Sequence, residues 1–519
     1  MNIFLALITV VFLVDIIFFA IFFDRYAVLG LLLLPILAGF LYMRQHVLKP
    51  KAIRRSFVGW RLPNAIDVSI PDRPKPAPDA LIQDCFFDQG ILVIGARGSG
   101  KTKSANLGIL KTLDDIWPQS GFAQFDGKGD LDFYKDIVGA GIRLDRFFSS
   151  EMPYSCSTNL LEGDVHDNID LLANILVGKS NNTDYYSDAQ ISVLQKVMPI
   201  LFASGEPVNL RDLYAMLTND DAAINVMRLA QASNVDESIL NFAREYFEIP
   251  LFNRVMEIKG MLNKLFTFCS GPMADRLNAY QPDLSIAQAV ANNERVFFHL
   301  PLSEFSKRVA EAFTEKFEVE ASRRQKKLAS SEHPFSLSFD DWGEFIYEGF
   351  EPFAARCRSA NMPLMFSFQS RAQLDAVNPT FADTMDDHMT TKIVMRVNGD
   401  YTSRYAAQLM GRYDSVNASI SEHSSEGVSM GVQSTDRFST HDFRDLAKGE
   451  AFTSTVIEDE FGRTRNKLYR FRFPLIDTNV ANAAMPEPHP INEGYGLGLW
   501  SHCKGEQPHH NVILESEAV

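Results

Sequence analysis

The feature that most constrains this chain is a glycine-rich octapeptide that directly follows a short apolar run. The run is Ile91–Ile94, and the octapeptide Gly95–Thr102 reads GARGSGKT. Residues 103–111, which come next, are compatible with a helix. A strand, a glycine-rich turn and a helix start, in this order, are the context of a phosphate-binding P-loop. The octapeptide therefore predicts a nucleotide site in an α/β domain. The alternative is a glycine turn that matches by chance.

The octapeptide suits a polyphosphate that carries a magnesium ion. Glycines allow backbone N–H groups to curl around the phosphates, and the helix N-terminus adds partial positive charge. Lys101 can reach the β- and γ-phosphates, and Thr102 can hold Mg²⁺. The predicted ligands are therefore ATP and Mg²⁺. The predicted nucleotide-binding residues are Gly95, Arg97, Gly98, Ser99, Gly100, Lys101 and Thr102.

A second motif supplies the carboxylates that ATP hydrolysis needs. The apolar run Phe335–Phe339 ends in Asp340 and Asp341, which is the form of a Walker B motif. We expect Asp340 to hold Mg²⁺ through water, and Asp341 to orient or deprotonate the attacking water. Glu344 is the competing base. Gln369 follows another candidate strand and is predicted to contact the γ-phosphate; a polar cap of that strand is the alternative.

The N-terminus carries two long apolar segments. Residues 3–23 contain one charge, Asp15, and residues 26–43 contain none. Because a membrane span needs about 20 apolar residues, the pattern predicts a two-helix transmembrane hairpin. Residues 44–61 hold six lysines and arginines and no acid, which places this segment and both termini in the cytoplasm. A soluble helical hairpin is the alternative, but few soluble helices are apolar on every face.

Overall charge argues against a protein that coats nucleic acid, and cysteine spacing argues against a structural zinc site. The formal charge is −15, so the chain is not built to coat nucleic acid, and any contact with DNA would be local. The five cysteines are scattered without metal-ligand spacing, as expected of free thiols in a reducing compartment. The roughly 470 residues after the apolar segments are too many for one ordinary core. We therefore expect two or three domains there.

Apolar runs and helical patterns give the domain plan. Short apolar runs bounded by turn residues predict parallel strands of an α/β sheet at 91–94, 122–125, 296–300, 335–339, 364–368 and 392–396. Between residues 164 and 293, apolar residues keep helical spacing instead. The predicted parts are a transmembrane hairpin at 1–46, a basic juxtamembrane segment with a proline-rich linker at 47–84, a nucleotide-binding domain at 85–164 and 291–480, an inserted all-α domain at 165–290, and a C-terminal tail at 481–519.

Two segments are predicted to lack regular structure. Residues 414–435 are rich in serine, glycine and charge, which favours a mobile loop. The residues after Pro486 show little periodicity, which favours a loosely ordered tail.

Further short motifs follow the octapeptide in a specific order. They are Phe125–Asp130 (FDGKGD), Thr158–Leu161 (TNLL), the pair Tyr185 and Tyr186, the Walker B run, Arg356 and Arg358 upstream of Gln369, Thr391–Arg396, and Arg437–Ala451. Together with the two apolar segments, this order resembles the coupling proteins of conjugation and type IV secretion, the TraG/TraD/TrwB family of membrane-anchored P-loop ATPases. Each motif is weak alone, whereas their order and spacing are specific. The resemblance covers residues 85–475.

This resemblance implies a RecA-like motor with an inserted all-α domain. It also implies a hexameric ring whose channel passes DNA or protein, with the all-α domain receiving the substrate complex. An arginine from one subunit would complete the neighbour's active site; Arg358 matches best, and Arg356 or Arg396 are alternatives. The implied partners are further copies of the chain, inner-membrane components of the secretion channel, a relaxase–DNA complex or protein cargo brought by adaptors, and membrane lipid.

The implied function is that of a bacterial inner-membrane coupling ATPase, which hands DNA or protein to a secretion channel. Its catalytic residues would be Lys101, Asp341, Gln369 and Arg358. One alternative is an FtsK/HerA-like membrane DNA pump outside secretion. Another is a nucleotide-gated membrane scaffold with little hydrolysis, because the family's usual Asp-Glu is Asp-Asp here and aspartate has the shorter reach.

Overall fold

The computed structural model describes residues 59–504, with gaps at 72, 84–88, 153–154, 179–184, 234, 327–332, 348, 421–427, 460–461, 481–482, 487–489 and 492–493. The predicted membrane hairpin at 1–46 lies outside these residues. No helix of the described part is long and apolar enough to cross a membrane. The chain divides into two compact units, and the site described below lies within the second, residues 57–457 and 466–519.

One mixed β-sheet of eleven described strands forms the core, in the order β3-β2-β15-β14-β11-β5-β10-β9-β6-β8-β7. The strands are β2 (Ile66–Asp67), β3 (Lys75–Pro76), β5 (Ile91–Ile94), β6 (Gly121–Asp126), β7 (Arg146–Ser149), β8 (Arg295–His299), β9 (Phe335–Asp340), β10 (Leu364–Phe368), β11 (Thr391–Met395), β14 (Glu450–Glu458) and β15 (Thr464–Arg472). From β11 to β7 all pairings are parallel. Strand β14 is antiparallel to β11, and β2 is antiparallel to β15 and β3. The six predicted strands are confirmed within a residue or so at each end, and they lie in the parallel part.

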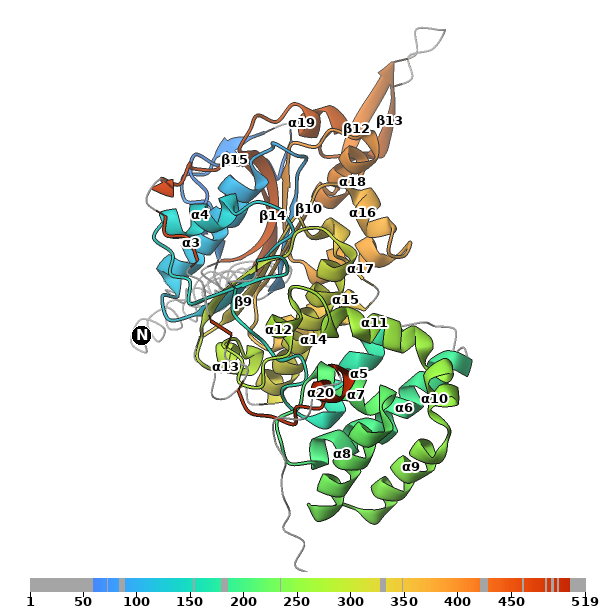
Figure 1. Cartoon of the computed structure of the whole chain (residues 1–519). Coiled ribbons are helices and arrows are strands. Elements are labelled where there is room, and N and C mark those ends of the chain that lie inside the picture. The colour runs from blue at the N-terminus through green and yellow to red at the C-terminus, as the bar shows by residue number, and fades with distance from the viewer. Residues whose placement is uncertain are drawn as a thin grey trace, which may run out of the picture. The chain divides into compact units, whose positions relative to one another are not determined.

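Helices cover both faces of the parallel strands, which explains their continuous apolar runs. Successive residues of β8 point to opposite faces. Phe297 packs against Tyr134 of α4 (Asp132–Gly139), and Phe298 packs against Phe313 and Phe317 of α14 (Glu304–Lys326). Helix α3 (Leu107–Ile116) lies near α4, and α15 (Phe350–Ser359) lies near α14 (Figure 1). The remaining elements near the sheet are the β1–β4 pair (Gly59–Arg61, Leu81–Gln83), α16 (Arg371–Asp375), α17 (Phe381–His388), α18 (Asp400–Met410) and α19 (Thr440–Arg444).

A cluster of stacked rings joins the central strands. Phe125 on β6 lies between Phe298 on β8 and Phe339 on β9, with ring centroids 4.5 and 4.6 Å away. Trp342 and Phe317 meet the same ring edge-on at 5.3 and 5.8 Å. This packing fixes the relative positions of β6 and β9, whose carboxyl ends carry functional carboxylates.

The segment between β7 and β8 consists of helices, and we call residues 165–291 the helical insertion. It contains α5 (Val165–Leu172), η4 (Ala173–Val177), α6 (Tyr185–Ala203), α7 (Leu210–Thr218), α8 (Asp220–Ala232), α9 (Glu237–Glu248), α10 (Leu251–Glu257), α11 (Lys259–Cys269), α12 (Ala274–Leu277) and α13 (Ile286–Ala291). Helices α5 to α11 gather in the green part of Figure 1. Because β7 and β8 are parallel neighbours, a long crossover between them accommodates the insertion without breaking the sheet.

The prediction of a mobile loop at 414–435 is wrong for the described residues 414–420 and 428–435. Strands β12 (Arg412–Ile420) and β13 (Val428–Asp436) form an antiparallel ribbon that extends beyond α18 and α19 (Figure 1). Its register pairs Val416 with Val432 and Ile420 with Val428. These β-branched residues favour strands, whereas the expectation of a loop rested on the serines and glycines between them.

The prediction of a loosely ordered tail after Pro486 is wrong for its described C-terminal end. Residues 500–504 form helix α20 (Trp500–Lys504), and Leu499 before it is buried. The segment is too short to show periodicity in the sequence, yet its leucines and tryptophan pack against the hydrophobic core, and the Trp500 ring contacts Tyr214 on α7.

Candidate functional site

The octapeptide Gly95–Thr102 connects β5 to a helix that starts as η3 (Lys101–Asn106) and continues as α3. Gly98 and Gly100 have φ angles of 78° and 101°. Glycine adopts this left-handed backbone without strain, so the chain can curl before the helix begins. The predicted strand, turn and helix start are therefore present at the P-loop.

Two neighbouring segments hold the loop in place. The Gly95 N–H donates to the Phe368 carbonyl at the end of β10, at 3.2 Å. The Gly449 N–H donates to the Ser99 carbonyl at 2.9 Å. The segment Arg437–Ala451, one of the motifs that resemble the coupling proteins, thus contacts the P-loop through Gly449. This contact explains why a motif so distant in sequence lies at the nucleotide site.

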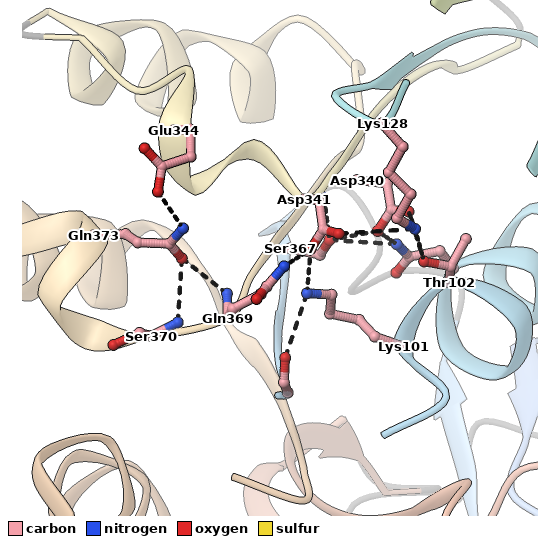
Figure 2. A network of polar contacts seen from close by, with 12 residues as sticks. Lys101, Thr102, Lys128, Asp340, Asp341, Glu344, Ser367, Gln369, Ser370 and Gln373 are labelled. Carbon is pink, nitrogen blue, oxygen red and sulfur yellow. Dashed lines mark hydrogen bonds and ion pairs between the residues drawn. The ribbon is translucent and has the colours of Figure 1, made fainter. Parts of the chain in front are cut away.

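The two predicted motifs meet at the carboxyl edge of the sheet (Figure 2). The Lys101 ammonium lies 2.5 Å from Asp341 Oδ1 and donates to the Gly95 carbonyl at 3.3 Å. The Thr102 hydroxyl donates to Asp340 Oδ2 at 2.7 Å. Although β10 separates β5 from β9, the carboxyl ends of parallel strands reach the same edge. Lys101, Thr102, Asp340 and Asp341 are therefore brought together as the sequence predicts.

Three residues outside the predicted site hold the buried Asp340 carboxylate. Asn106 Nδ2 and the Ser367 hydroxyl donate to its Oδ1, at 2.5 and 2.9 Å. The Lys128 ammonium lies 2.9 Å from its Oδ2 and also donates to the Thr102 hydroxyl. Burial lowers the pKa of Lys128, but the carboxylates of Asp340, Asp126 and Asp341 outweigh burial and raise it. Lys128 thus contacts both of the oxygens that are expected to hold Mg²⁺.

Asp126 adds a carboxyl group beside Asp340. The two residues are register partners on β6 and β9, and both are fully buried. Burial and the neighbouring Asp340 carboxylate raise the pKa of Asp126 well above its usual value. One Asp126 oxygen accepts the Lys128 backbone N–H at 3.1 Å, which shapes the turn carrying the lysine. The motif FDGKGD at 125–130, which contains both Asp126 and Lys128, is the sequence signal for this segment.

Asp341 is held for a role different from that of Asp340. Gln369 Nε2 donates to its Oδ1 at 3.1 Å. Burial alone would raise the pKa of Asp341, but Lys101, Lys128 and the Gln369 amide lower it below the usual range. The carboxylate is therefore ionised at neutral pH and faces the P-loop lysine.

Glu344, the competing base, does not reach this position. Its carboxylate is exposed and accepts a hydrogen bond from Gln373 Nε2 at 2.9 Å. The Gln373 carbonyl oxygen accepts the backbone N–H groups of Gln369 and Ser370, at 3.1 and 3.2 Å (Figure 2). Glu344 therefore supports the strand end that carries Gln369, and of these two candidate bases only Asp341 contacts Lys101.

The candidate arginines occupy three different environments. Arg358 is exposed on α15 and does not line the pocket of its own P-loop. Arg356 forms an ion pair with Glu318 on α14 of the same chain. Arg396 lies beside the P-loop, because its carbonyl accepts the Ala96 N–H at 2.8 Å. A residue that acts on a neighbouring subunit must be exposed and must lie outside the nucleotide pocket of its own chain, and Arg358 meets both conditions.

A pocket of about 530 Å³ opens over the P-loop. Its lining includes the predicted residues Arg97, Gly98, Gly100, Lys101, Thr102, Asp341 and Gln369, together with Lys103, Lys128, Asp130, Asp136 and Lys448. Gly95 and Ser99 are buried beneath it, and the Ser99 hydroxyl has no hydrogen-bond partner among the described residues. The lining is rich in cations and backbone N–H groups, which suits a polyphosphate.

The donor set at the base of this pocket fits a magnesium ion. The Thr102 hydroxyl and the Asp340 carboxylate are hard oxygen ligands, and both contact the Lys128 ammonium. The described residues contain no group of three or more His, Cys, Asp or Glu that could hold a metal. Magnesium is usually held by one or two carboxylates together with substrate phosphates, so a sparse protein set is sufficient.

Comparison with known proteins agrees with the motifs. A family model described as the TraM recognition site of TraD and TraG matches residues 334–449. That range runs from the Walker B strand to Gly449 at the P-loop. No curated protein sequence matches the chain.

Solved structures of the bacterial conjugative coupling protein TrwB share the fold. The unbound monoclinic form of TrwBΔN70 is 14% identical, with a TM-score of 0.52, over 84% of this chain and 97% of that chain. The trigonal form with sulphate has a TM-score of 0.54 at 14% identity, over 84% and 100%. The complex of TrwB with ADP and Mg²⁺ has a TM-score of 0.53 at 15% identity, over 82% and 97%. The predicted resemblance to the TraG/TraD/TrwB coupling proteins and the α/β, RecA-like P-loop fold are confirmed.

Proposed function

We propose that this chain is a membrane-anchored coupling ATPase of a conjugation or type IV secretion system, which recruits DNA or protein and drives its transfer by ATP hydrolysis. The observation that carries the proposal is the meeting of Lys101, Thr102, Asp340, Asp341 and Gln369 at one edge of a TrwB-like sheet. The family match at 334–449 covers the Walker B side of this site.

The proposed ligands are ATP and Mg²⁺, and the solved TrwB complexes contain an ATP analogue or ADP with Mg²⁺. ATP supplies the phosphoanhydride, and Mg²⁺ supplies divalent charge on its phosphates. Thr102 and Asp340 would hold the ion. Lys101 would leave Asp341 and stabilise charge that grows on the phosphates during hydrolysis. Asp341 would then orient the attacking water, with Gln369 fixing its carboxylate.

The proposed cellular setting follows from the sequence and from the family. The apolar segments 3–23 and 26–43 would anchor the chain in a bacterial inner membrane, with both termini and the ATPase in the cytoplasm. Further copies would form a hexameric ring, with Arg358 reaching the neighbouring site. The matched model describes TraM recognition, so we include a protein of the DNA-processing complex among the partners, beside channel components, cargo and lipid.

The direct test is ATP hydrolysis by the detergent-purified full chain, with and without DNA. Wild type is expected to hydrolyse ATP in a Mg²⁺-dependent way, and Lys101→Ala to lose most of the activity. Equal rates for the two proteins would exclude the motor. In that case, retained nucleotide binding would support the second candidate, a nucleotide-gated scaffold. One observation favours that candidate: Asp341, shorter than the family's usual glutamate, is bound to Lys101.

A further inference from the structure

The end of the chain returns to the helical insertion and lies across α7. We call residues 494–504 the C-terminal strap. The Leu497 N–H donates to the Pro207 carbonyl at 3.0 Å, and the Leu499 N–H donates to Asp212 Oδ1 at 2.8 Å. Between them, the Gly498 N–H donates to the Tyr280 hydroxyl at 2.8 Å. Three backbone N–H groups of one short stretch therefore donate hydrogen bonds to the insertion.

The acceptor for this stretch is a buried carboxylate. Asp212 is 0% exposed, and its two oxygens each accept the Tyr280 hydroxyl at 2.9 Å. It also closes the capping box of α7 with Asn209. Burial raises the pKa of Asp212 to about 7, although Leu499, Tyr280 and Asn209 donate to it. A buried carboxylate that accepts hydrogen bonds from the strap backbone and from the half-buried Tyr280 is a built site and not an incidental surface contact.

Apolar and aromatic contacts anchor the strap on either side of these hydrogen bonds. Leu499 is 1% exposed within the core of the insertion. The Trp500 ring meets Tyr214 edge-on, with centroids 5.7 Å apart. The Arg211 guanidinium lies 5.5 Å from the Trp500 ring centroid, within range of a cation–π contact. Leu499 and Trp500 thus act as side-chain anchors for the strap.

The glycine spacing of the strap matches the surface beneath it. A Cβ atom at Gly496 would lie 2.1 Å from the Tyr280 ring, and one at Gly494 would lie 2.7 Å from the Gln281 side chain. Such contacts leave no room for a larger residue. The sequence from Gly494 to Trp500 (GYGLGLW) is therefore complementary to this face at alternate positions.

We propose that α7 and Tyr280 form a peptide-binding site for a glycine-spaced Leu–Trp segment, and that the chain's own residues 494–504 are its occupant. The docked strap closes this face of the insertion to any other copy of the segment. A released strap leaves the face open to the same segment from a neighbouring subunit. The site holds whether or not the chain hydrolyses ATP.

The test uses the full chain and a synthetic fluorescent peptide of residues 494–504 with Cys503→Ser. Gly496→Ala in the protein should prevent its own strap from docking, because of the contact with Tyr280. We expect the peptide to bind this variant saturably by fluorescence anisotropy, and wild type at least about tenfold more weakly, which corresponds to 1.4 kcal/mol. A matched control is Gly260→Ala on α11, where a Cβ meets only an ordinary contact at 3.6 Å. It should behave as wild type.

Two further measurements show whether the variant is folded and whether the peptide binds through the same contact. Hydrogen exchange should show slow amides at 497–499 in wild type and fast ones in Gly496→Ala, while α7 stays protected. If that variant does not fold, Leu499→Ser with Trp500→Ala, which changes only the strap, replaces it. A peptide carrying Gly496→Ala should fail to bind. The proposal is overturned if the peptide does not bind a folded, strap-released variant, or binds wild type equally well.

Discussion

Asp341 shows how backbone geometry limits which acid can stand at the end of β9. Its φ and ψ are 52° and 39°, in the left-handed region. Aspartate and asparagine adopt this region more readily than other side chains with a Cβ. The Asp-Asp pair of this chain therefore agrees with the local backbone, and an amide can replace the acid with little strain.

Asp341→Asn is expected to keep the fold and nucleotide binding while lowering kcat by about 10²-fold or more, the contribution of a positioned base. Steady-state ATPase rates and a fluorescent-nucleotide titration measure the two effects separately. Glu344→Gln, which alters an exposed acid bound to Gln373, should leave kcat nearly unchanged. If Glu344→Gln loses as much activity as Asp341→Asn, the assignment of the base is wrong.

Lys128→Met should destabilise the nucleotide-free protein, because the buried Asp340 then loses its ammonium partner. We expect a loss of about 1–3 kcal/mol, the cost of a buried acceptor left without its donor. Mg²⁺ with ADP should restore much of this, since the ion takes the place of the ammonium. Chemical unfolding with and without Mg²⁺ and ADP measures the difference. Lys111→Met, a pair on the surface of α3, should lose less than about 1 kcal/mol under both conditions.

Some residues of the site are neighbours in the sequence, and others meet only in the folded protein. Lys101 and Thr102, or Asp340 and Asp341, are contiguous motifs whose chemistry can be assigned without a structure. Lys128 and Ser367 meet Asp340 because β6 and β10 flank β9, and Asn106 reaches it from η3, which follows β5. A strand order does not follow from apolar runs, so these partners could not be predicted, although FDGKGD pointed to the segment.

At the scale of elements, the ring stack on β6 couples stability to the site. Phe125→Ala would remove a buried ring in contact with Phe298 and Phe339. We expect the free energy of unfolding to fall by about 3–5 kcal/mol, as for other buried aromatic truncations. Denaturant unfolding of the full chain measures it. Phe252→Ala, a side chain 74% exposed, is the control and should change it little. Similar losses from both variants would contradict a central role for the stack.

The same scale shows why some elements were predicted and others were not. Strands β5, β6 and β8 to β11 are buried on both faces, so short runs rich in apolar residues reveal them. Strand β15 carries three exposed arginines and the half-buried Lys467, so its place in the sheet cannot be predicted from hydropathy. The ribbon β12–β13 and the strap have compositions typical of loops. The ribbon is ordered by pairing between its own two strands, whereas the strap is ordered by Asp212 and Tyr280, which lie far away in the sequence.

For the whole molecule, the position of Arg358 predicts dependence on neighbours. Mixing inactive Arg358→Ala with inactive Lys101→Ala should restore part of the ATPase activity, because mixed rings join an intact Lys101 site to an intact Arg358. The reason is that a guanidinium must reach the γ-phosphate of another subunit to stabilise its charge. Arg356→Ala, which removes an ion pair within one chain, should not need such rescue. Absence of recovery in rings shown to be mixed would contradict a trans role.

The position of the strap also gives the molecule a natural chemical label. Among the described cysteines, Cys156, Cys269 and Cys357 are buried, and Cys503 on α20 is exposed beside Thr218. A thiol-selective dye should therefore mark the strap before the interior of the fold. Partial burial raises the pKa of Cys503, so its alkylation rate should increase when α20 leaves α7. The pace of that reaction can follow strap release during nucleotide turnover without any substitution in the protein.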